Sequence, residues 1–379
     1  MKNPEIRFID DNIDWEEKKL GELNNLSVPT IYKNYYLEIG DIKPLSNSYI
    51  LDKTKKIVSG AKLATNGTIL VSTVRPTRGA ICKLKDGNMF VSSALYQFNS
   101  NNEFLNDIIL QQLQTYKFLK YCGDNCEGGT YPTISKENID KFIVKTPKNV
   151  EKISKTLTSI DVKIINQTAI IEKLYNTKSA LLIKMFPQEN QSIPELRFDG
   201  FTDTWEQRKL KDITQITMGQ SPDGNTYSEQ PNKYILVQGN ADLQNGWVYP
   251  RIWTSQMTKK AEKGDLIMSV RAPAGSIGKT AYDVVIGRGV AAIKGNEFLY
   301  QSLVKMDIGG YWKKIACGST FESINSDDIR DAEIFIPNNK EQFCIGKLFT
   351  TLDHLITLHQ RKLDKLKEVK AALLEKLLV

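Results

Sequence analysis

The stretch PEIRFIDDNIDWEEKKL at Pro4–Leu20 recurs as PELRFDGFTDTWEQRKL at Pro194–Leu210. The copies are 190 residues apart (194 − 4), and Trp15 matches Trp205 at the same offset. Such a repeat in a chain of 379 residues predicts that one structural unit is present twice. We expect the two tryptophans to be core residues of that unit.

The similarity continues downstream in the same order. Three further pairs of segments match: GTILVSTVR (67–75) with GDLIMSVR (264–271), GTYPTI (129–134) with GSTFESI (318–324), and KFIVKTP (141–147) with DAEIFIP (331–337). Arg75 and Arg271 end the first of these pairs, so we expect them at equivalent positions. The chain is therefore interpreted as a tandem duplication.

The first part of each half mixes short apolar runs with turns rich in Gly, Asn, Pro and Ser, which is typical of an α+β domain. The strand-like runs are Thr68–Val74, Ile235–Gly239, Leu266–Val270 and Gly289–Ile293. We expect one α+β domain at residues 1–150 and a second at residues 188–338.

A long helix is predicted to close each half, at residues 151–187 and 339–379. Apolar residues recur there in alternating steps of three and four, from Leu157 to Met185 and from Leu352 to Leu377. This spacing is the heptad seam of a left-handed coiled coil. The simplest arrangement packs the two helices on each other, and the spacing alone leaves parallel and antiparallel pairing open.

Polar residues interrupt both seams at matching positions. Lys178 corresponds to Lys370, and Asp161 corresponds to Asp353 at an offset of 192 (353 − 161). The other matched pair is Gln167 with His359. A polar residue in a seam usually fixes the register of the helices, although the same residues would also be tolerated near a helix surface.

Composition indicates a folded, mildly basic protein. The net charge of +7 is compatible with nucleic acid as a partner without requiring it. No apolar run reaches the roughly 18 residues of a membrane span, and the first residues lack the apolar core of a signal peptide. The five cysteines and two histidines, His354 and His359, show no metal-ligand spacing. Cys122 and Cys126 are interpreted as packed, reduced thiols of a cytoplasmic protein rather than a redox pair.

Catalytic motifs were sought and not found. The chain has no Asn/Asp-Pro-Pro-aromatic loop for methyl transfer to a flipped base and no GxxxxGK(S/T) phosphate loop. The nearest phosphate-loop candidate, GSIGK at Gly275–Lys279, lacks the full spacing and is interpreted as a structural loop. The neighbouring carboxylates Asp327 and Asp328 are interpreted as part of a helix start rather than a nuclease site.

The order of variable domain, long helix, variable domain, long helix resembles the specificity subunits of type I restriction-modification systems. The paired PE(I/L)RF openings share this resemblance, as do the stretches GQSPDGNTY (219–227), SVRAPAGSIGKT (269–280) and IGRGVAAIKG (286–295). The resemblance implies two target recognition domains that read a bipartite DNA sequence, and antiparallel central helices that act as a spacer. Because the two domains differ in sequence, the target is expected to be asymmetric.

The resemblance also implies the partners of the chain. Double-stranded DNA is the expected ligand, with two methyltransferase subunits docked on the central helices and restriction subunits joined through the complex. S-adenosylmethionine, ATP and magnesium would then be bound by those partners, and this chain would hold no cofactor and no catalytic site. The alternatives are an orphan recognition subunit and a coiled-coil scaffold without DNA specificity.

Candidate DNA-binding residues were chosen from polar loops that follow predicted strands, because Arg, Lys, Asn and Gln read base edges and phosphates. In the first domain they are Arg75, Thr77, Arg78, Thr130 and Tyr131. In the second they are Gln220, Ser221, Asn225, Tyr227, Arg271, Lys279, Ser319 and Thr320. Arg75 and Arg271 occupy matched positions, and the alternative for them is a structural role or a phosphate contact without specificity. Tyr131 and Phe321 also match, and the alternative for them is a role in the shared framework.

Overall fold

The computed structural model describes residues 15–188, 191–316 and 323–378. The chain divides into two compact units, Met1–Thr168 with Arg361–Val379, and Ala169–Gln360. Each unit contains one globular head and parts of both long helices. We call residues 15–147 the first head and residues 205–337 the second head.

The repeated openings pair with the repeated closing segments. In the first head, β1 (Trp15–Lys19) runs antiparallel to β10 (Ile143–Pro147). In the second head, β11 (Glu206–Lys209) runs antiparallel to β23 (Glu333–Ile336). Trp15 and Trp205 are 7% and 3% exposed, as expected for core residues. The tandem duplication predicted from the sequence is therefore present in the structure.

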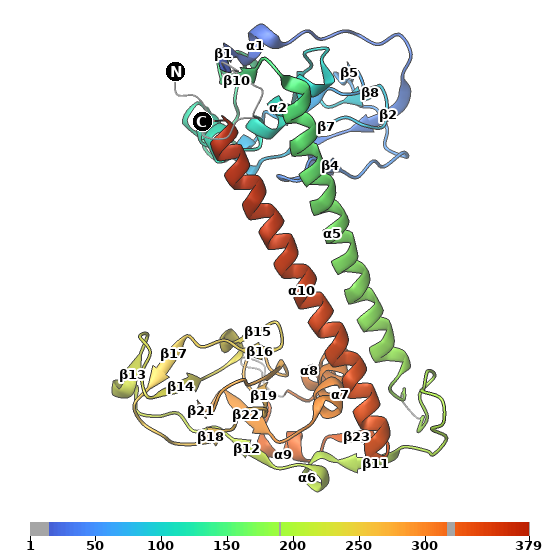
Figure 1. The fold of residues 1–379 in the computed structure, drawn as a ribbon, viewed down its shortest axis with the longest axis vertical. Coiled ribbons are helices and arrows are strands. Elements are labelled where there is room, and N and C mark those ends of the chain that lie inside the picture. Colours follow the sequence, from blue (N-terminus) through green and yellow to red (C-terminus); the bar gives the residue numbers. More distant parts are fainter. Residues whose placement is uncertain (1–14, 189–190, 317–322, 379) are drawn as a thin grey trace. The chain divides into compact units, whose positions relative to one another are not determined.

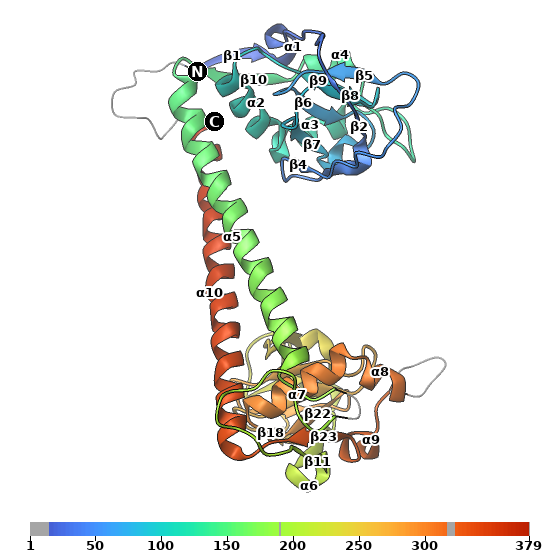
Figure 2. The ribbon, with the colours of Figure 1, turned by 90° about the vertical axis from the view of Figure 1, so that its right-hand side faces the viewer.

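The first head is built in three layers (Figure 2). The middle sheet has the order β7-β6-β9, with β6 (Ile69–Ser72), β7 (Ile81–Lys83) and β9 (Leu95–Phe98). The face of this sheet that carries Ile69 and Val71 packs on α2 (Glu103–Leu113) and α3 (Tyr116–Asp124). Its Leu70 side packs on the sheet β2-β8-β5, formed by Lys33–Leu37, Met89–Val91 and Lys62–Ala64.

The second head repeats these layers with sheets that contain more strands (Figure 1). The middle sheet has the order β12-β22-β19-β20-β16-β15, formed by Ile216–Met218, Val290–Ile293, Leu266–Ser269, Ile277–Lys279, Trp247–Val248 and Leu243–Gln244. The outer sheet has the order β13-β17-β14-β21-β18, formed by Tyr227–Ser228, Ile252–Thr254, Tyr234–Val237, Val284–Ile286 and Lys260–Ala261. The helices are α7 (Glu297–Ile308) and α8 (Tyr311–Ile315).

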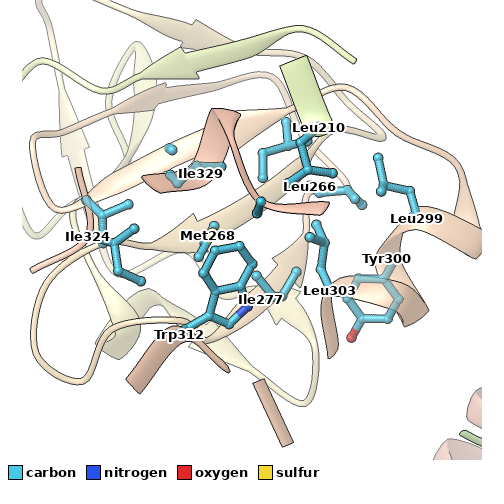
Figure 3. Close-up of a cluster of buried hydrophobic side chains, with 14 of the residues drawn as sticks. Leu210, Leu266, Met268, Ile277, Leu299, Tyr300, Leu303, Trp312, Ile324 and Ile329 are labelled. Carbon is cyan, nitrogen blue, oxygen red and sulfur yellow. The ribbon is translucent and has the colours of Figure 1, made fainter. Parts of the chain in front are cut away.

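The helix side of the second head holds its largest hydrophobic cluster (Figure 3). Met268 of β19 and Ile277 of β20 pack there with Leu303 of α7 and with Trp312, which is fully buried.

Sequence also explains where the helices begin. The Asn102 side chain accepts the N–H of Leu105 at the start of α2, and Asn296 accepts that of Leu299 at α7.

Short elements connect these layers. In the first head they are α1 (Leu20–Leu23), η1 (Ile39–Asp41), β3 (Ile42–Lys43), β4 (Ser48–Tyr49), η2 (Pro76–Arg78) and α4 (Lys136–Asp140). In the second they are α6 (Leu210–Ile213), η3 (Gly224–Thr226), η4 (Asn240–Asp242) and α9 (Ser326–Arg330). Asn325 caps α9 with Asp328 in its first turn, which confirms the helix start expected there.

The two long helices are α5 (Val150–Lys184) and α10 (Asn339–Leu378). In the first unit, Leu157 near the start of α5 belongs to one cluster with Leu373 near the end of α10. In the second unit, Leu182 near the end of α5 clusters with Phe349 near the start of α10. The start of each helix therefore packs beside the end of the other, which is the antiparallel order that the resemblance implied.

Mirrored ion pairs join the long helices at the polar seam positions. In the second unit, Lys178 Nζ lies 2.6 Å from Asp353 Oδ1, and Gln301 of α7 donates to Asp353 at 3.3 Å. In the first unit, Lys370 Nζ lies 2.6 Å from Asp161 Oδ1, and Asp161 accepts from Gln111 of α2 at 2.5 Å. The lysines and aspartates are therefore paired across the helices, which supports a role in fixing their register over tolerance near a surface.

Among residues 15–188, 191–316 and 323–378, no helix combines the length and the apolar character that a bilayer crossing requires.

Candidate nucleic-acid interface

Three strand ends meet at one corner of the second head. The carboxyl ends of β12 and β19 lie on either side of the amino end of β22, because both strands run antiparallel to it. Backbone hydrogen bonds hold the following residues together: Gly219 N–H donates to Val290 O at 3.0 Å, and Val270 N–H donates to Gly289 O at 2.9 Å. The loops that leave these strands therefore share one surface.

Close backbone approach at this corner depends on glycine. A Cβ built on Gly219 would lie 2.1 Å from the carbonyl oxygen of Gly287, a distance that no side chain tolerates. Next to this contact, the N–H of Gln220 donates to Ile286 O at 2.9 Å. The sequence GQS at residues 219–221 is thereby held against the segment that contains Arg288.

We define the second-head corner as Gln220, Ser221, Gln238, Arg271 and Arg288. Arg271 and Arg288 are exposed, and neither guanidinium has a hydrogen-bond or ion-pair partner among the described residues. Ser221 Oγ accepts the N–H of Arg288 at 3.1 Å, which fixes the backbone from which this arginine projects. Two arginines and an exposed Gln220 on one surface match the residue types that bind guanine edges, adenine edges and phosphates.

The sequence prediction included Gln220, Ser221 and Arg271 but missed Arg288 and Gln238. Arg288 stands between Gly287 and Gly289 in the stretch IGRGV. A charged residue between two glycines, directly before an apolar run, is the signal that could have identified it. Gln238 directly follows β14, and its N–H donates to Asp242 at 2.7 Å.

The rest of the GQSPDGNTY loop is held by its own hydrogen bonds. Asp223 accepts the N–H of Asn225 at 3.1 Å, and the Asp223 N–H donates to Gln256 at 2.7 Å. The Asn225 side chain is exposed, so it remains a candidate DNA contact. Tyr227 is half-buried, and its hydroxyl donates to Pro222 O at 3.2 Å, which indicates a role in shaping the loop.

Lys279 is held inside the second head. Its Nζ lies 2.8 Å from Glu297 Oε2 and sits between two aromatic rings, 4.7 Å from the Trp247 centroid and 4.5 Å from that of Tyr300. The side chain is 13% exposed. A lysine that is already paired and covered is a poor phosphate ligand, so we leave Lys279 out of the proposed interface. Ser319 and Thr320 lie outside the described residues.

In the first head, the predicted residues lie around Arg75. Its guanidinium lies 4.2 Å from the ring centroid of Tyr131 and donates to Thr130 O at 3.3 Å. The Tyr131 ring is 65% exposed, so the pair forms an aromatic and cationic surface open to solvent. Thr77 and Arg78 follow in η2 with exposed side chains. The five residues therefore lie near one another in the sequence segments 75–78 and 130–131, with Arg75 half-buried and the other four exposed.

Strand pairing corrects the expected equivalence of Arg75 with Arg271. Ser72 donates to Val74 O, whereas the matching Ser269 donates to Arg271 O. Val74 also bridges to Thr133 as Arg271 bridges to Ser323. Arg271 therefore corresponds to Val74. Arg75 is displaced by one residue and has a left-handed backbone, with φ of 48°, a conformation that non-glycine residues rarely adopt.

The same logic identifies the first-head counterpart of Arg288. Thr73 N–H donates to Ala94 O as Val270 N–H donates to Gly289 O, so Ala94 corresponds to Gly289. The residue before it, Ser93, therefore occupies the place of Arg288. The two heads share a framework but present different side chains at the same corner.

No group of three or more His, Cys, Asp or Glu side chains that could bind a metal occurs within the described ranges. Burial raises the pKa of the Cys122 thiol to about 12, and Cys122 is fully buried. This agrees with a packed thiol rather than a redox-active one.

Comparison with known proteins identifies the family. The model of the type I restriction modification DNA specificity domain matches residues 12–176 and again residues 202–368. The chain belongs to this family. As a family member it is a DNA-specificity protein and not an enzyme.

Relatives in the specificity family come from Methanocaldococcus jannaschii. The MjaX specificity subunit is 27% identical over 241 residues, which cover 60% of this chain and 56% of that protein. The match to the type I restriction enzyme MjaVIII specificity subunit is 21% identical over 400 residues and covers 96% of this chain and 92% of that protein. The chain thus spans just over half of the first relative and nearly all of the second.

Solved structures share the fold of this family member. The type I restriction-modification system S subunit from M. genitalium has a TM-score of 0.66 at 16% identity, covering 100% of this chain and 99% of that one. A chain from work on the complex assembly and conformational transition of the type I R-M system has a TM-score of 0.53 at 22% identity, covering 96% and 97%.

Proposed function

We propose that the chain reads a bipartite, asymmetric DNA sequence, with one half-site for each head. The observation that carries this proposal is the difference at one shared corner: Arg271 and Arg288 in the second head stand where the first head has Val74 and Ser93. A duplicated framework with different side chains at its exposed loops is suited to reading two different half-sites.

In this proposal residues 1–150 and 188–338 are the target recognition domains, and residues 151–187 and 339–379 are the spacer helices. The second-head corner and Asn225 contact one half-site. The group around Arg75, with Thr77, Arg78, Thr130 and Tyr131, contacts the other.

Partner subunits complete the proposed complex. Two methyltransferase subunits would dock on the long helices, and restriction subunits would join through them in the cytoplasm. Exposed apolar side chains on α5 support docking there: Val162, Ile165, Ile170, Tyr175 and Ile183 are each at least 41% exposed. These exposed apolar side chains are available for contact with a partner protein.

The test is single-molecule methylome sequencing of a host that expresses the chain with the methyltransferase encoded beside its gene. The matched strain lacks the chain. A split adenine-methylated motif that disappears with the chain is the expected result. Methylation that is unchanged by its loss would contradict the proposal and favour an orphan subunit or a scaffold.

A further inference from the structure

The middle sheets of the two heads end differently. In the second head, β12 covers the edge of β22, with Ile216 opposite Ile293, Thr217 opposite Ala292 and Met218 opposite Ala291. In the first head, β9 is the last strand of its sheet. The segment that corresponds to β12 at the 190-residue offset is Leu26–Val28, and it forms no strand.

The pairing starts in the first head and then stops. Asn25 N–H donates to Asn99 O at 2.7 Å, at the positions that correspond to Gln215 and Lys294 in the second head. Residues 26–30 then make no hydrogen bond to any described part of the chain. The segment is anchored again where Asn88 donates to Ile31 O at 2.7 Å. Residues 26–30 therefore lie unpaired beside β9, between the hydrogen-bonded residues Asn25 and Ile31.

A gap with a mixed lining separates this segment from β9. A cavity of about 570 Å³ lies there, and its apolar lining includes Leu26, Val28, Leu63, Phe90 and Leu95. Its polar lining includes Ser27, Lys62, Thr73, Ser93, Gln97 and Lys136. Val28 is 79% exposed and Leu26 is 42% exposed, although both have the apolar character of the paired residues Ile216 and Met218. On this edge of β9 the Asn24 side chain donates to Gln97 O at 3.0 Å, and no described strand pairs there. An unpaired strand edge beside a partly apolar cavity is a site where one more strand can add.

Pro29 explains why the gap stays open. It occupies the position of Gly219, whose N–H donates to Val290 O and whose missing side chain permits contact with Gly287. Proline has no N–H, and the first head has Ser92 in the place of Gly287. Pairing of residues 26–28 would therefore lack the bond that locks β12, so the closed arrangement is less stable in the first head than β12 is in the second.

We propose that residues 26–30 are a strap that closes onto β9 when the first head binds DNA. Leu26, Ser27 and Val28 then pair with Phe98, Gln97 and Tyr96, in the register of β12 on β22. Closure moves Pro29 and Thr30 to the corner beside Ser93 and Arg75, where the second head has Gly219 and Gln220. This inference rests on the proposed DNA recognition. Closure requires that DNA bind the closed arrangement more tightly than the open one, and DNA contacts at that corner would provide this difference.

The test is disulfide crosslinking in the full-length chain, with Cys126, Cys317 and Cys344 replaced by serine. Ser27→Cys with Gln97→Cys probes the strap, because opposed strand positions have the Cα separation that a disulfide needs. Thr217→Cys with Ala292→Cys is the matched control in the second head and should crosslink without DNA. Duplex carrying the target sequence found by methylome sequencing should raise the strap crosslinking rate about tenfold, as expected if the closed state is a minor population of roughly 10% in the free protein.

A third variant separates the possible outcomes. Pro29→Gly restores the N–H and should raise strap crosslinking about tenfold without any DNA. DNA binding measured on the same samples by fluorescence anisotropy reports the proposed function independently. Normal DNA binding with an unchanged crosslinking rate would overturn the strap and leave the proposed function intact. If DNA is not bound at all, the proposed function fails, and an unchanged rate in Pro29→Gly overturns the strap as well.

Discussion

The two heads differ most where their shared strands end. The second head closes its middle sheet with β12 and presents Arg271 and Arg288 at the resulting corner, both unpaired among the described residues. In the first head no described strand pairs with the outer edge of β9, and Arg75 stacks on Tyr131. Their buried layers are alike, with helices on one side of the middle sheet and a second sheet on the other. The comparison teaches that buried residues preserve the framework while strand ends carry the differences that recognition needs.

The largest expected effect comes from removing Arg271 and Arg288 together. Arg271→Ala with Arg288→Ala should weaken binding at one half-site by about 2–6 kcal/mol, since each bidentate contact to a base contributes about 1–3 kcal/mol. The other half-site should be read as before. Fluorescence anisotropy with duplexes altered in one half-site at a time measures this. Arg208→Ala, an exposed arginine on β11, is the control, and equal losses with all duplexes would contradict a base-reading role.

The next expected effect concerns a buried ion pair in the second unit. Arg197 donates to both oxygens of Glu341, at 2.6 and 2.7 Å, and the Glu341 side chain is fully buried. Arg197→Ala leaves a buried carboxylate without its partner, so we expect a loss of about 3–5 kcal/mol in the free energy of unfolding. Urea denaturation measures the loss. Glu341→Gln in the same background should recover part of it, and a double variant as unstable as the single one would contradict this explanation.

The mirrored ion pairs between the long helices provide a smaller and sharper comparison. Lys178→Ala and Lys370→Ala should each cost about 1–2 kcal/mol, because these pairs are only partly buried. Lys178→Ala should cost more, since Asp353 keeps a hydrogen bond of 3.3 Å whereas Asp161 keeps one of 2.5 Å. Denaturation curves of the two variants, recorded side by side, test the order. A larger loss in Lys370→Ala than in Lys178→Ala would contradict the idea that the glutamine hydrogen bonds stabilise the unpaired aspartates.

The smallest expected effect concerns the aromatic surface of the first head. Tyr131→Ala removes the ring beneath Arg75, and an exposed cation–π contact contributes about 0.5–1 kcal/mol. Binding at the first half-site should therefore fall by roughly two- to fivefold. Tyr131→Phe keeps the ring and should bind like the parent chain. Equal losses in both variants would indicate that the hydroxyl, and not the ring, acts in binding.

Most of the framework was predictable from the sequence. The repeated openings and closings, the four strand-like runs and the two long helices are all present, because each depends on local apolar spacing and on caps such as Asn325. The matching of Arg75 with Arg271 was wrong because it followed residue identity. The ungapped alignment from Gly67 and Gly264 matches Val74 with Arg271, in agreement with the strand pairing.

The candidate site was only partly predictable. Loops after strands were correctly expected to be exposed, as Gln220, Arg78 and Arg271 are. Lys279 is paired with Glu297 and covered by the rings of Trp247 and Tyr300. These three side chains come from other elements, so the residues next to Lys279 in the sequence do not indicate that it is covered. Arg288 was missed because its role follows from the meeting of three strands, which local patterns do not reveal.

The division of the chain into units has a consequence for its synthesis. Ala169–Gln360 is continuous, so every residue of the second unit is made before Arg361–Val379. The first unit begins at the amino terminus but also includes Arg361–Val379, which supply Lys370 for Asp161 and Leu373 for the cluster at Leu157. Domains usually complete folding in the order of their synthesis. In this chain the unit that begins to be made first is thus completed only when Arg361–Val379 are available.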